Sequence, residues 1–332
     1  MLFERNPMDI TATEVSNIWA SYLKNSMELR FFEYFFVSAE DKKIKKVVER
    51  LLHQSKKNLN QLEAFFKKDK LTIPIGFTNE DIKVEAPKLF SDTFILYFCH
   101  DITQLSLSTY PSALSECIRE DIRDYFQISI EFTFKIQNEI VALMLSKGIH
   151  LKPPQIDIDD RIDFAKSIKY LNGFFGGSRP LNVAEIANIS RIIHRAQFSK
   201  MVFVTFSKLA VSPDLKTHFS KGRDTIEKVI DSLQEIFKEE NIALSSSGDF
   251  KIFDVEMSPF SDKLMMFFVN TCLGIFCFTM VNQAMSSSLR SDIILKLTKI
   301  TNDMKKYYGK GLILSIKENW LEQPPQAVDR KV

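Results

Sequence analysis

The feature that most constrains this chain is a residue pattern that recurs about 171 positions further along the sequence. In the stretch 90–92 the offset is 170, because Phe-Ser-Asp recurs at 260–262, and one compensated single-residue gap explains that difference. An offset held over such a length indicates an internal duplication. The residue pairs at offset 171 are Glu14 and Glu185, Asn17 and Asn188, Leu62 and Leu233, Phe66 and Phe237, Arg119 and Arg290, Asp121 and Asp292, and Ile122 and Ile293.

Each copy has the periodicity of long amphipathic helices. In the first copy, apolar residues recur at helical spacing over 15–36, 44–66, 89–109 and 112–146, with the third helix predicted to stop at Pro111. The segment 71–86 is a long connection between the second and third helices. Four helices with one long connection predict a ferritin-like four-helix bundle. The second copy is predicted to have helices over 183–210, 213–240, 259–286 and 287–317.

The predicted fold is therefore all-α, with two tandem ferritin-like four-helix bundles related by internal duplication. The expected domains are a first bundle over 1–155, a linker with a short helix and a Gly-rich hinge over 156–181, a second bundle over 182–320 and a flexible tail over 321–332. A count of 29 Phe and only 10 Gly agrees with this, since packed helices need large apolar side chains and few turns.

Charge and cysteine usage limit the partners and the compartment. The 44 Lys and Arg against 42 Asp and Glu give a net charge of +2, so no strong basic field indicates nucleic acid. The N-terminus lacks the basic and apolar regions of a secretory signal, and the four cysteines form no Cys-x-x-Cys pair. We expect reduced, buried thiols in a cytoplasmic protein.

One apolar stretch is long enough to be considered as a membrane span. Residues 264–289 contain no charged residue. The corresponding helix of the first copy contains His100 and Asp101, and a membrane span opposite a charged counterpart is unexpected. The sequence therefore predicts a buried bundle helix and no membrane span.

Several strings resemble a known family. They are IPIGFTNEDIKVEAPKLFSDTF (73–94), REDIRDYF (119–126), MLSKGIHLKPPQI (144–156), LNGFFGGSRPLN (171–182) and PFSDKLMM (259–266). Together they resemble the domain of unknown function 3231 family of spore-forming bacteria over nearly the whole chain. The resemblance implies tandem ferritin-like bundles, sometimes described as spore-coat-like. It implies no established activity, and spore association is an alternative to a purely cytoplasmic location.

A ferritin-like metal site is the first chemical function to consider. Such sites take Glu-x-x-His from two helices, and none of the five histidines has Glu three residues before it. Helical projection places Glu28 well off the apolar face of the first helix. Family members commonly have His after paired lysines in the second helix, where this chain has Asn58. The polar residues predicted to face the bundle interior are Glu33, Ser55, Asn58, Asp101, Ser129 and Thr133.

This polar set has two interpretations. The favoured one is a buried hydrogen-bonded network, since buried carboxylates need partners. The other is a remnant metal site at Glu33 and Asp101, with Asn58 and Thr133 as neighbours, holding iron or manganese. The second copy has Val204, Val229 and Thr271 in place of Glu33, Asn58 and Asp101, which predicts a simply packed core. His194, beside Arg191 and Arg195, is interpreted as part of a solvated helix face.

Three functions remain open. The first is a non-enzymatic helical scaffold or interaction protein related to sporulation, without a cofactor. The second is a divergent metal-binding or redox protein that uses the remnant site. The third is a carrier of an apolar small molecule, suggested by the Phe- and Met-rich third helix of the second copy. A protein partner or a homo-oligomer is expected, and nucleic acid is not.

Overall fold

The computed structural model describes residues 9–157, 163–173, 179–244, 251–255 and 257–327. Contacts within the chain divide it into two compact units, which are described separately. Unit 1 contains residues 1–149, 251–264 and 318–332, and unit 2 contains residues 150–250 and 265–317. The predicted helix start around the aspartates at 159 and 160 and the glycines at 176 and 177 fall outside the described residues.

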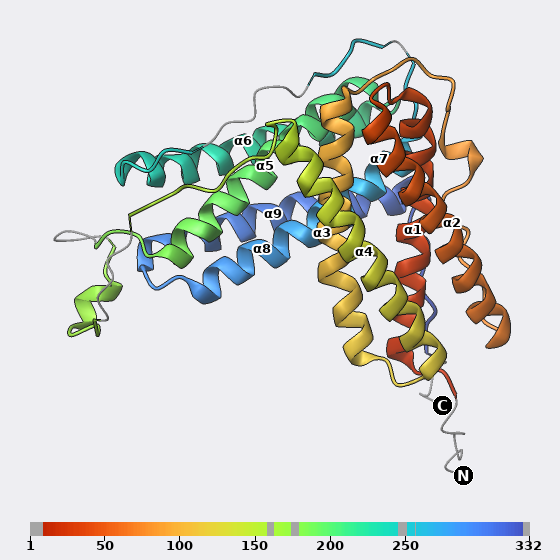
Figure 1. Ribbon diagram of the computed structural model, residues 1–332, viewed down its shortest axis with the longest axis horizontal. Helices are drawn as coiled ribbons and strands as arrows, with labels where there is room; N and C mark the ends of the chain where they lie inside the picture. The colour runs from red at the N-terminus through yellow and green to blue at the C-terminus, as the bar shows by residue number, and fades with distance from the viewer. Residues whose placement is uncertain (1–8, 158–162, 174–178, 245–250, 256, 328–332) are drawn as a thin grey trace. The chain divides into compact units, whose positions relative to one another are not determined.

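Unit 1 is built from four long helices (Figure 1). Helix α1 packs along α2, and α3 packs along α4. Thr11 caps α1 through a reciprocal pair of hydrogen bonds with Glu14, which satisfies backbone donors that the first helical turn leaves open. The helices are α1 (Ala12–Ser38), α2 (Lys42–Lys68), α3 (Asp92–Glu116) and α4 (Glu120–Ser146), with a 3₁₀ turn at Asn79–Asp81.

The predicted end of the third helix is wrong. Helix α3 continues through Pro111 to Glu116, and α4 begins at Glu120. Proline removes one backbone donor and disturbs one turn. The buried side chains of Tyr110 and Ala113 on either side of it pack into the core of unit 1, and this packing holds the helix together.

A segment from the second copy completes the core of unit 1. The ring of Phe260 lies 4.5 Å from that of Phe31 and 5.3 Å from that of Tyr34. Phe260 also forms an antiparallel bridge with Ile82, and the Ser261 hydroxyl donates to an Asp81 carboxylate oxygen at 2.7 Å. Residues 251–264 therefore belong to the first compact unit, although the predicted boundary gave them to the second bundle.

The C-terminal tail is also part of unit 1. The Glu322 carboxylate accepts hydrogen bonds from the backbone N–H groups of Ile75 and Gly76, at 2.9 and 2.6 Å. Gly76 has a φ of +63°, and a Cβ there would overlap the hydroxyl of Ser26. The turn that presents these N–H groups therefore needs glycine.

Unit 2 repeats the arrangement. Helix α5 packs along α6, and α8 packs along both α5 and α9. Helix α7 runs through a π-helical turn, Phe268–Leu273, into α8. The elements are α5 (Val183–Leu209), α6 (Pro213–Glu239), α8 (Gly274–Ser287), α9 (Ser291–Lys317) and the second half of α7 (Asp262–Phe267), whose first three residues belong to unit 1. The part of the chain that the structure describes has no β-strand, so the prediction of an all-α fold with duplicated bundles is confirmed.

The duplication extends to the helix ends. After α2 the chain turns through Lys70 with a φ of 54°, and after α6 it turns through Asn241 with the same value. Gly148 after α4 and Asn319 after α9 have φ values of 67° and 58°. Both pairs are 171 positions apart, so the two copies end corresponding helices with the same left-handed residue.

One described helical stretch, Asp262–Ser287, is long and apolar enough to cross a membrane by length and composition. Within its most apolar window, 65% of the residues are buried inside the structure. A core helix of a folded bundle has this property too, because such a helix is apolar on most of its sides.

Candidate functional site

A buried ion pair lies in the centre of unit 1. Lys24 and Glu28 are one turn apart on α1, and the Lys24 Nζ is 2.7 Å from the Glu28 Oε1. The same ammonium donates to the hydroxyl of Ser106 at 2.7 Å and to that of Tyr110 at 3.3 Å, both on α3. Oxygen atoms from two helices therefore hold one fixed positive charge inside the bundle.

Burial and pairing set the ionisation of these groups. Burial alone would lower the pKa of Lys24, but the Glu28 carboxylate and the Tyr110 hydroxyl outweigh burial and raise this pKa above its ordinary value. Burial raises the pKa of Glu28, and the Lys24 ammonium opposes that rise. The lysine is thus the firmly charged member of the pair.

Amide side chains extend the polar centre from α3 to α2. The Asn25 Nδ2 donates to the Tyr110 hydroxyl at 3.2 Å, and the Asn58 Nδ2 donates to the Asn25 Oδ1 at 2.9 Å. Gln54 then donates to the Asn58 Oδ1 at 2.7 Å. Each donor in this chain has an acceptor, which is the condition for burying polar groups without a large free-energy cost.

A cavity of about 20 Å³ adjoins this network. A space of this size holds about one water molecule and no larger ligand. Its polar lining comes from all four helices of unit 1. These lining residues include Asn25, Glu28, Ser55, Asn58, Ser106, Tyr110, Ser129 and Thr133.

The structure separates the residues predicted for a metal site. Asn58 and Thr133 line the cavity, together with Ser55 and Ser129. Glu33 does not line it: its side chain is 22% exposed and pairs with Arg30 at 3.0 Å and Lys56 at 3.8 Å. Asp101 is buried on α3 but is also not among the lining residues.

The helical projection of α1 was wrong about its acidic residues. Glu28 is 4% exposed and lies in the bundle centre, whereas it was predicted to face away. The projection assumed a single apolar face, but every residue from Lys24 to Phe32 is buried, so the middle of α1 is enclosed on all sides. A Lys-x-x-x-Glu spacing inside an apolar helix was the signal that could have identified the pair.

The centre of unit 1 does not fit a ferritin-like metal pair. Such a site takes carboxylates from each helix and two imidazoles. Here a lysine ammonium sits among the inward oxygens and provides the cation that the carboxylate requires. Among the described residues, no group of three or more His, Cys, Asp and Glu side chains is arranged to hold a metal ion.

Unit 2 has a buried cation at the corresponding position. Arg195, which is 171 residues after Lys24, is 6% exposed, and its Nη1 donates to the Ser199 hydroxyl at 3.2 Å. Ser199 corresponds to Glu28. The predictions of a solvated face at Arg195 and of a simply packed core are therefore wrong at this position: the guanidinium lies 5.3 Å from the ring centre of Phe198, inside the bundle.

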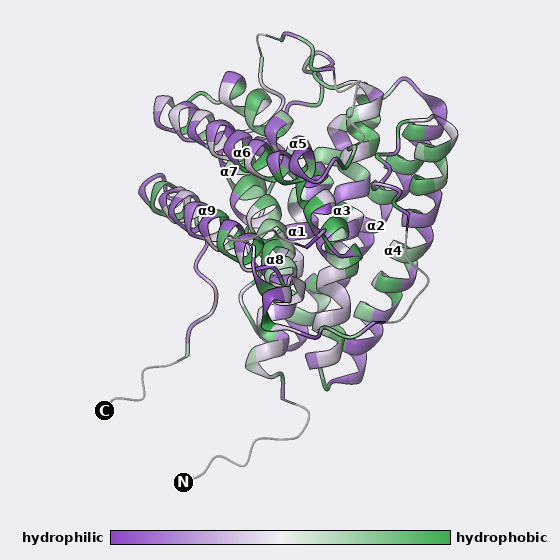
Figure 2. Ribbon diagram, turned by 90° about the vertical axis from the view of Figure 1, so that its left-hand side faces the viewer, coloured by the Kyte–Doolittle hydropathy of each residue, from purple (hydrophilic) through white to green (hydrophobic). Residues whose placement is uncertain are grey.

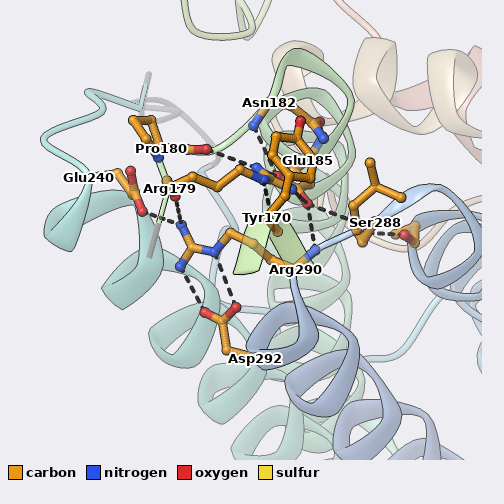
Figure 3. Close-up of polar contacts among 11 residues, drawn as sticks. Tyr170, Arg179, Pro180, Asn182, Glu185, Glu240, Ser288, Arg290 and Asp292 are labelled. Carbon is orange, nitrogen blue, oxygen red and sulfur yellow. Dashed lines mark hydrogen bonds and ion pairs between the residues drawn. The ribbon is translucent and has the colours of Figure 1, made fainter. Parts of the chain in front are cut away.

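A second polar cluster joins the helix ends of unit 2 (Figure 3). The Glu185 carboxylate accepts from the backbone N–H groups of Leu289 and Arg290, both at 3.0 Å, and pairs with both terminal nitrogens of Arg179 at 2.9 Å. Burial alone would raise the pKa of Glu185, but the Arg179 pair and these hydrogen bonds lower it to about 2. The carboxylate therefore fixes the connection between α8 and α9 to the start of α5.

Unit 1 has the same junction. The Glu14 carboxylate accepts from the backbone N–H groups of Ile118 and Arg119, at 3.0 and 2.8 Å. Arg119 then pairs with Asp69 at 2.6 Å and Asp121 at 2.7 Å, as Arg290 pairs with Glu240 and Asp292 in unit 2. The glutamate, arginine and aspartate that recur 171 positions apart thus have a structural role in both units: they hold helix ends together.

The match to a protein family agrees with the duplication. The family model described as "Protein of unknown function (DUF3231)" matches residues 3–162 and again 170–332. A crystal structure described as a "putative spore coat protein" from Bacillus halodurans C-125 is similar at 18% identity and a TM-score of 0.41, over 45% of this chain and 97% of that chain. No curated protein matches the sequence.

Proposed function

Since the chain belongs to the DUF3231 family, whose function is not assigned, we propose a function from its geometry: a non-enzymatic helical scaffold or interaction protein. One observation carries this proposal. The polar centre of unit 1 is filled by the Lys24–Glu28 ion pair and the hydrogen bonds around it, so its charged groups are already engaged with one another.

The surface of unit 2 supports the interaction part of the proposal. Three large apolar side chains are exposed near the end of α9: Leu312, Ile313 and Ile316, at 47%, 69% and 61%. Neighbouring exposed apolar residues on one helix end are typical of protein contact surfaces. A protein partner or a second copy of this chain is the corresponding binding partner.

Metal content and metal-dependent stability test the proposal together. We expect purified protein to contain iron, manganese and zinc far below one ion per chain. We also expect the melting temperature of unit 1 to be unchanged by added Mn²⁺ or Fe²⁺, because a ligand that binds only the folded state must raise it. A stoichiometric metal, or a clear rise in melting temperature, would overturn the scaffold proposal.

The metal-binding alternative makes a residue-specific prediction that separates it from non-specific ion binding. The observation that favours it is the buried carboxyl side chain of Asp101. If this alternative holds, Asp101→Asn and Glu33→Gln each abolish the rise in melting temperature. Glu131→Gln is the matched control, because Glu131 is an exposed acid on α4.

The structure gives little support to the carrier function. The apolar cavity in unit 2, lined by Ile192, Met280 and Met304 among others, has a volume of about 10 Å³. Small-molecule sites have volumes of several hundred Å³. Native mass spectrometry of protein from its natural host would detect a carried ligand if one displaced these side chains.

A role in sporulation rests on the family resemblance alone. The corresponding expectation is that the protein accumulates during spore formation and is recovered with the spore. Its abundance in growing cells and in purified spores, compared by quantitative proteomics, tests this directly.

A further inference from the structure

A long groove runs between α6 and α9 in unit 2. Its volume is about 670 Å³, far larger than the cavities in the two bundle centres. Residues at helical spacing line both sides, from His218 to Ser232 on α6 and from Lys296 to Lys310 on α9. Figure 2 shows the hydrophilic residues along these two helices.

Lysine dominates the lining of this groove. Six lysines and two aspartates line it, which leaves four net positive charges on a chain whose total is +2. Lys296 pairs with Glu235 at 3.4 Å. The other five lysines form no ion pair with any described residue. They are Lys221, Lys228, Lys299, Lys306 and Lys310.

The first copy shows that this charge is not a consequence of the helix pairing. On α4, the positions that correspond to the four lining lysines of α9 hold Tyr125, Ile128, Lys135 and Glu139. Glu139 is paired with Arg50, the counterpart of Lys221. Lys57 is the counterpart of Lys228, so these positions carry a net charge of +2 in unit 1, from three cations and one acid, against +4 in unit 2. The array of six lysines is therefore specific to unit 2.

The dimensions of the groove describe its ligand. The fifteen residues from His218 to Ser232 on α6, and the fifteen from Lys296 to Lys310 on α9, each span about 21 Å. The groove is therefore elongated, and its lysines are spread along its length. Such a groove fits a linear ligand, and charge complementarity makes that ligand an anion.

The chemistry of the lining selects among linear anions. An extended acidic peptide gains affinity from backbone hydrogen bonds, which helices cannot offer along their sides. Single-stranded nucleic acid needs aromatic faces for its bases. The two aromatic lining residues, His218 and Tyr307, stack on each other with ring centres 4.3 Å apart and planes at 11°. Lysine ammonium groups, by contrast, bind phosphates as point charges.

We propose that the α6–α9 groove binds a linear polyphosphate through its unpaired lysines. Titration of the full-length protein into a fluorescently labelled short-chain polyphosphate, followed by anisotropy, tests this. We expect binding at low ionic strength that weakens as salt is added, because exposed charges are screened.

Substitutions at the groove make the test specific. The triple variant Lys228→Gln, Lys299→Gln, Lys306→Gln should weaken binding about tenfold, the sum of three exposed charge contacts. The corresponding Lys→Arg triple variant should retain it. The matched control is Lys216→Gln with Lys305→Gln, two exposed lysines of the same helices that do not line the groove, and it should change the affinity less than twofold.

Three results would overturn the proposal. One is the absence of binding at low salt by protein whose circular dichroism shows it folded. Another is an equal loss of affinity in the groove and control variants. The third is tighter binding of a single-stranded oligonucleotide or a polyglutamate peptide of matched charge, which would assign the groove to that ligand instead.

Discussion

Replacement of Lys24 by Met tests whether the two charges of the buried ion pair in unit 1 depend on each other for stability. The variant keeps the length of the side chain and removes the ammonium that contacts Glu28, Ser106 and Tyr110. Removal of one partner of a buried pair costs about 3–5 kcal/mol, since the remaining charge is left uncompensated. Burial already raises the pKa of Glu28, so this carboxyl can take up a proton, and we expect the lower end of that range.

The double variant Lys24→Met, Glu28→Leu gives the decisive comparison. Both charges are then replaced by apolar groups of similar volume, which is often neutral for stability. The surrounding hydroxyls keep partners: Ser106 donates to the Ile102 carbonyl at 2.9 Å, and Tyr110 accepts from Asn25. We expect the free energy of unfolding of the double variant to lie within about 1 kcal/mol of the wild-type value.

Tryptophan fluorescence reports on the correct unit in this experiment. The chain has two tryptophans, and both Trp19 and Trp320 belong to unit 1. For a unit of this size each kcal/mol shifts the melting temperature by about 2–4 °C, so Lys24→Met should lower it by roughly 6–12 °C. Lys67→Met is the control, because Lys67 forms the same i,i+4 pair with Glu63 on the surface, at 3.4 Å, and should cost under about 0.5 kcal/mol.

The ion pair would be refuted if the losses of unfolding free energy caused by Lys24→Met alone and by Glu28→Leu alone sum to the loss in the double variant. Additive losses would mean that Lys24 and Glu28 are stabilised independently, by their other contacts. The buried pair would also be contradicted if Lys24→Met lowered the free energy of unfolding no more than Lys67→Met does. That result would show that the Lys24–Glu28 pair is solvated.

Two further predictions concern a buried histidine and the segment shared with unit 1. Burial lowers the pKa of His218 to about 4 from 6.5, so the folded state disfavours its proton; unit 2 should lose roughly 3 kcal/mol as the pH falls from 6.5 to 4. Hydrogen exchange of α6 amides measures this, and His218→Phe should remove the loss. Phe260→Ala should destabilise unit 1 by about 3–5 kcal/mol, measured by tryptophan fluorescence. Phe253→Ala, at a 43%-exposed ring of the same segment, should cost under about 1 kcal/mol, and equal losses would contradict the packing argument.

The helices and their duplication could be predicted because both leave local signals. A 3.6-residue apolar period marks a helix wherever it occurs, and the offset of 171 persists even at helix ends such as Lys70 and Asn241. Pro111 was misleading because proline is a local signal, whereas the burial of Tyr110 and Ala113 that overrides it depends on the tertiary fold.

The polar centre could be predicted only in part, for the same reason. Asn58 and Thr133 lie on amphipathic helices, where projection identifies the inward face, and both line the cavity. Helix α1 is enclosed on all sides through its middle, so no projection separates Glu28 from Glu33. The packing of Phe260 in unit 1 has no local signal at all, since it joins residues more than 200 positions apart.

The two copies allow structural features to be separated from functional ones. The joint formed by Glu14 and Arg119 recurs with Glu185 and Arg290, and a buried cation recurs at Lys24 and Arg195. Features present in both copies are explained by the fold that both copies share. The array of six lysines between α6 and α9 occurs in unit 2 only, since the corresponding positions of unit 1 hold three cations and one acid. Five of its lysines are exposed and have no ion-pair partner in the described part of the chain, so they contribute little to packing. Their mutual repulsion opposes folding, and this is why we propose a ligand for the groove of unit 2 as the functional difference between the copies.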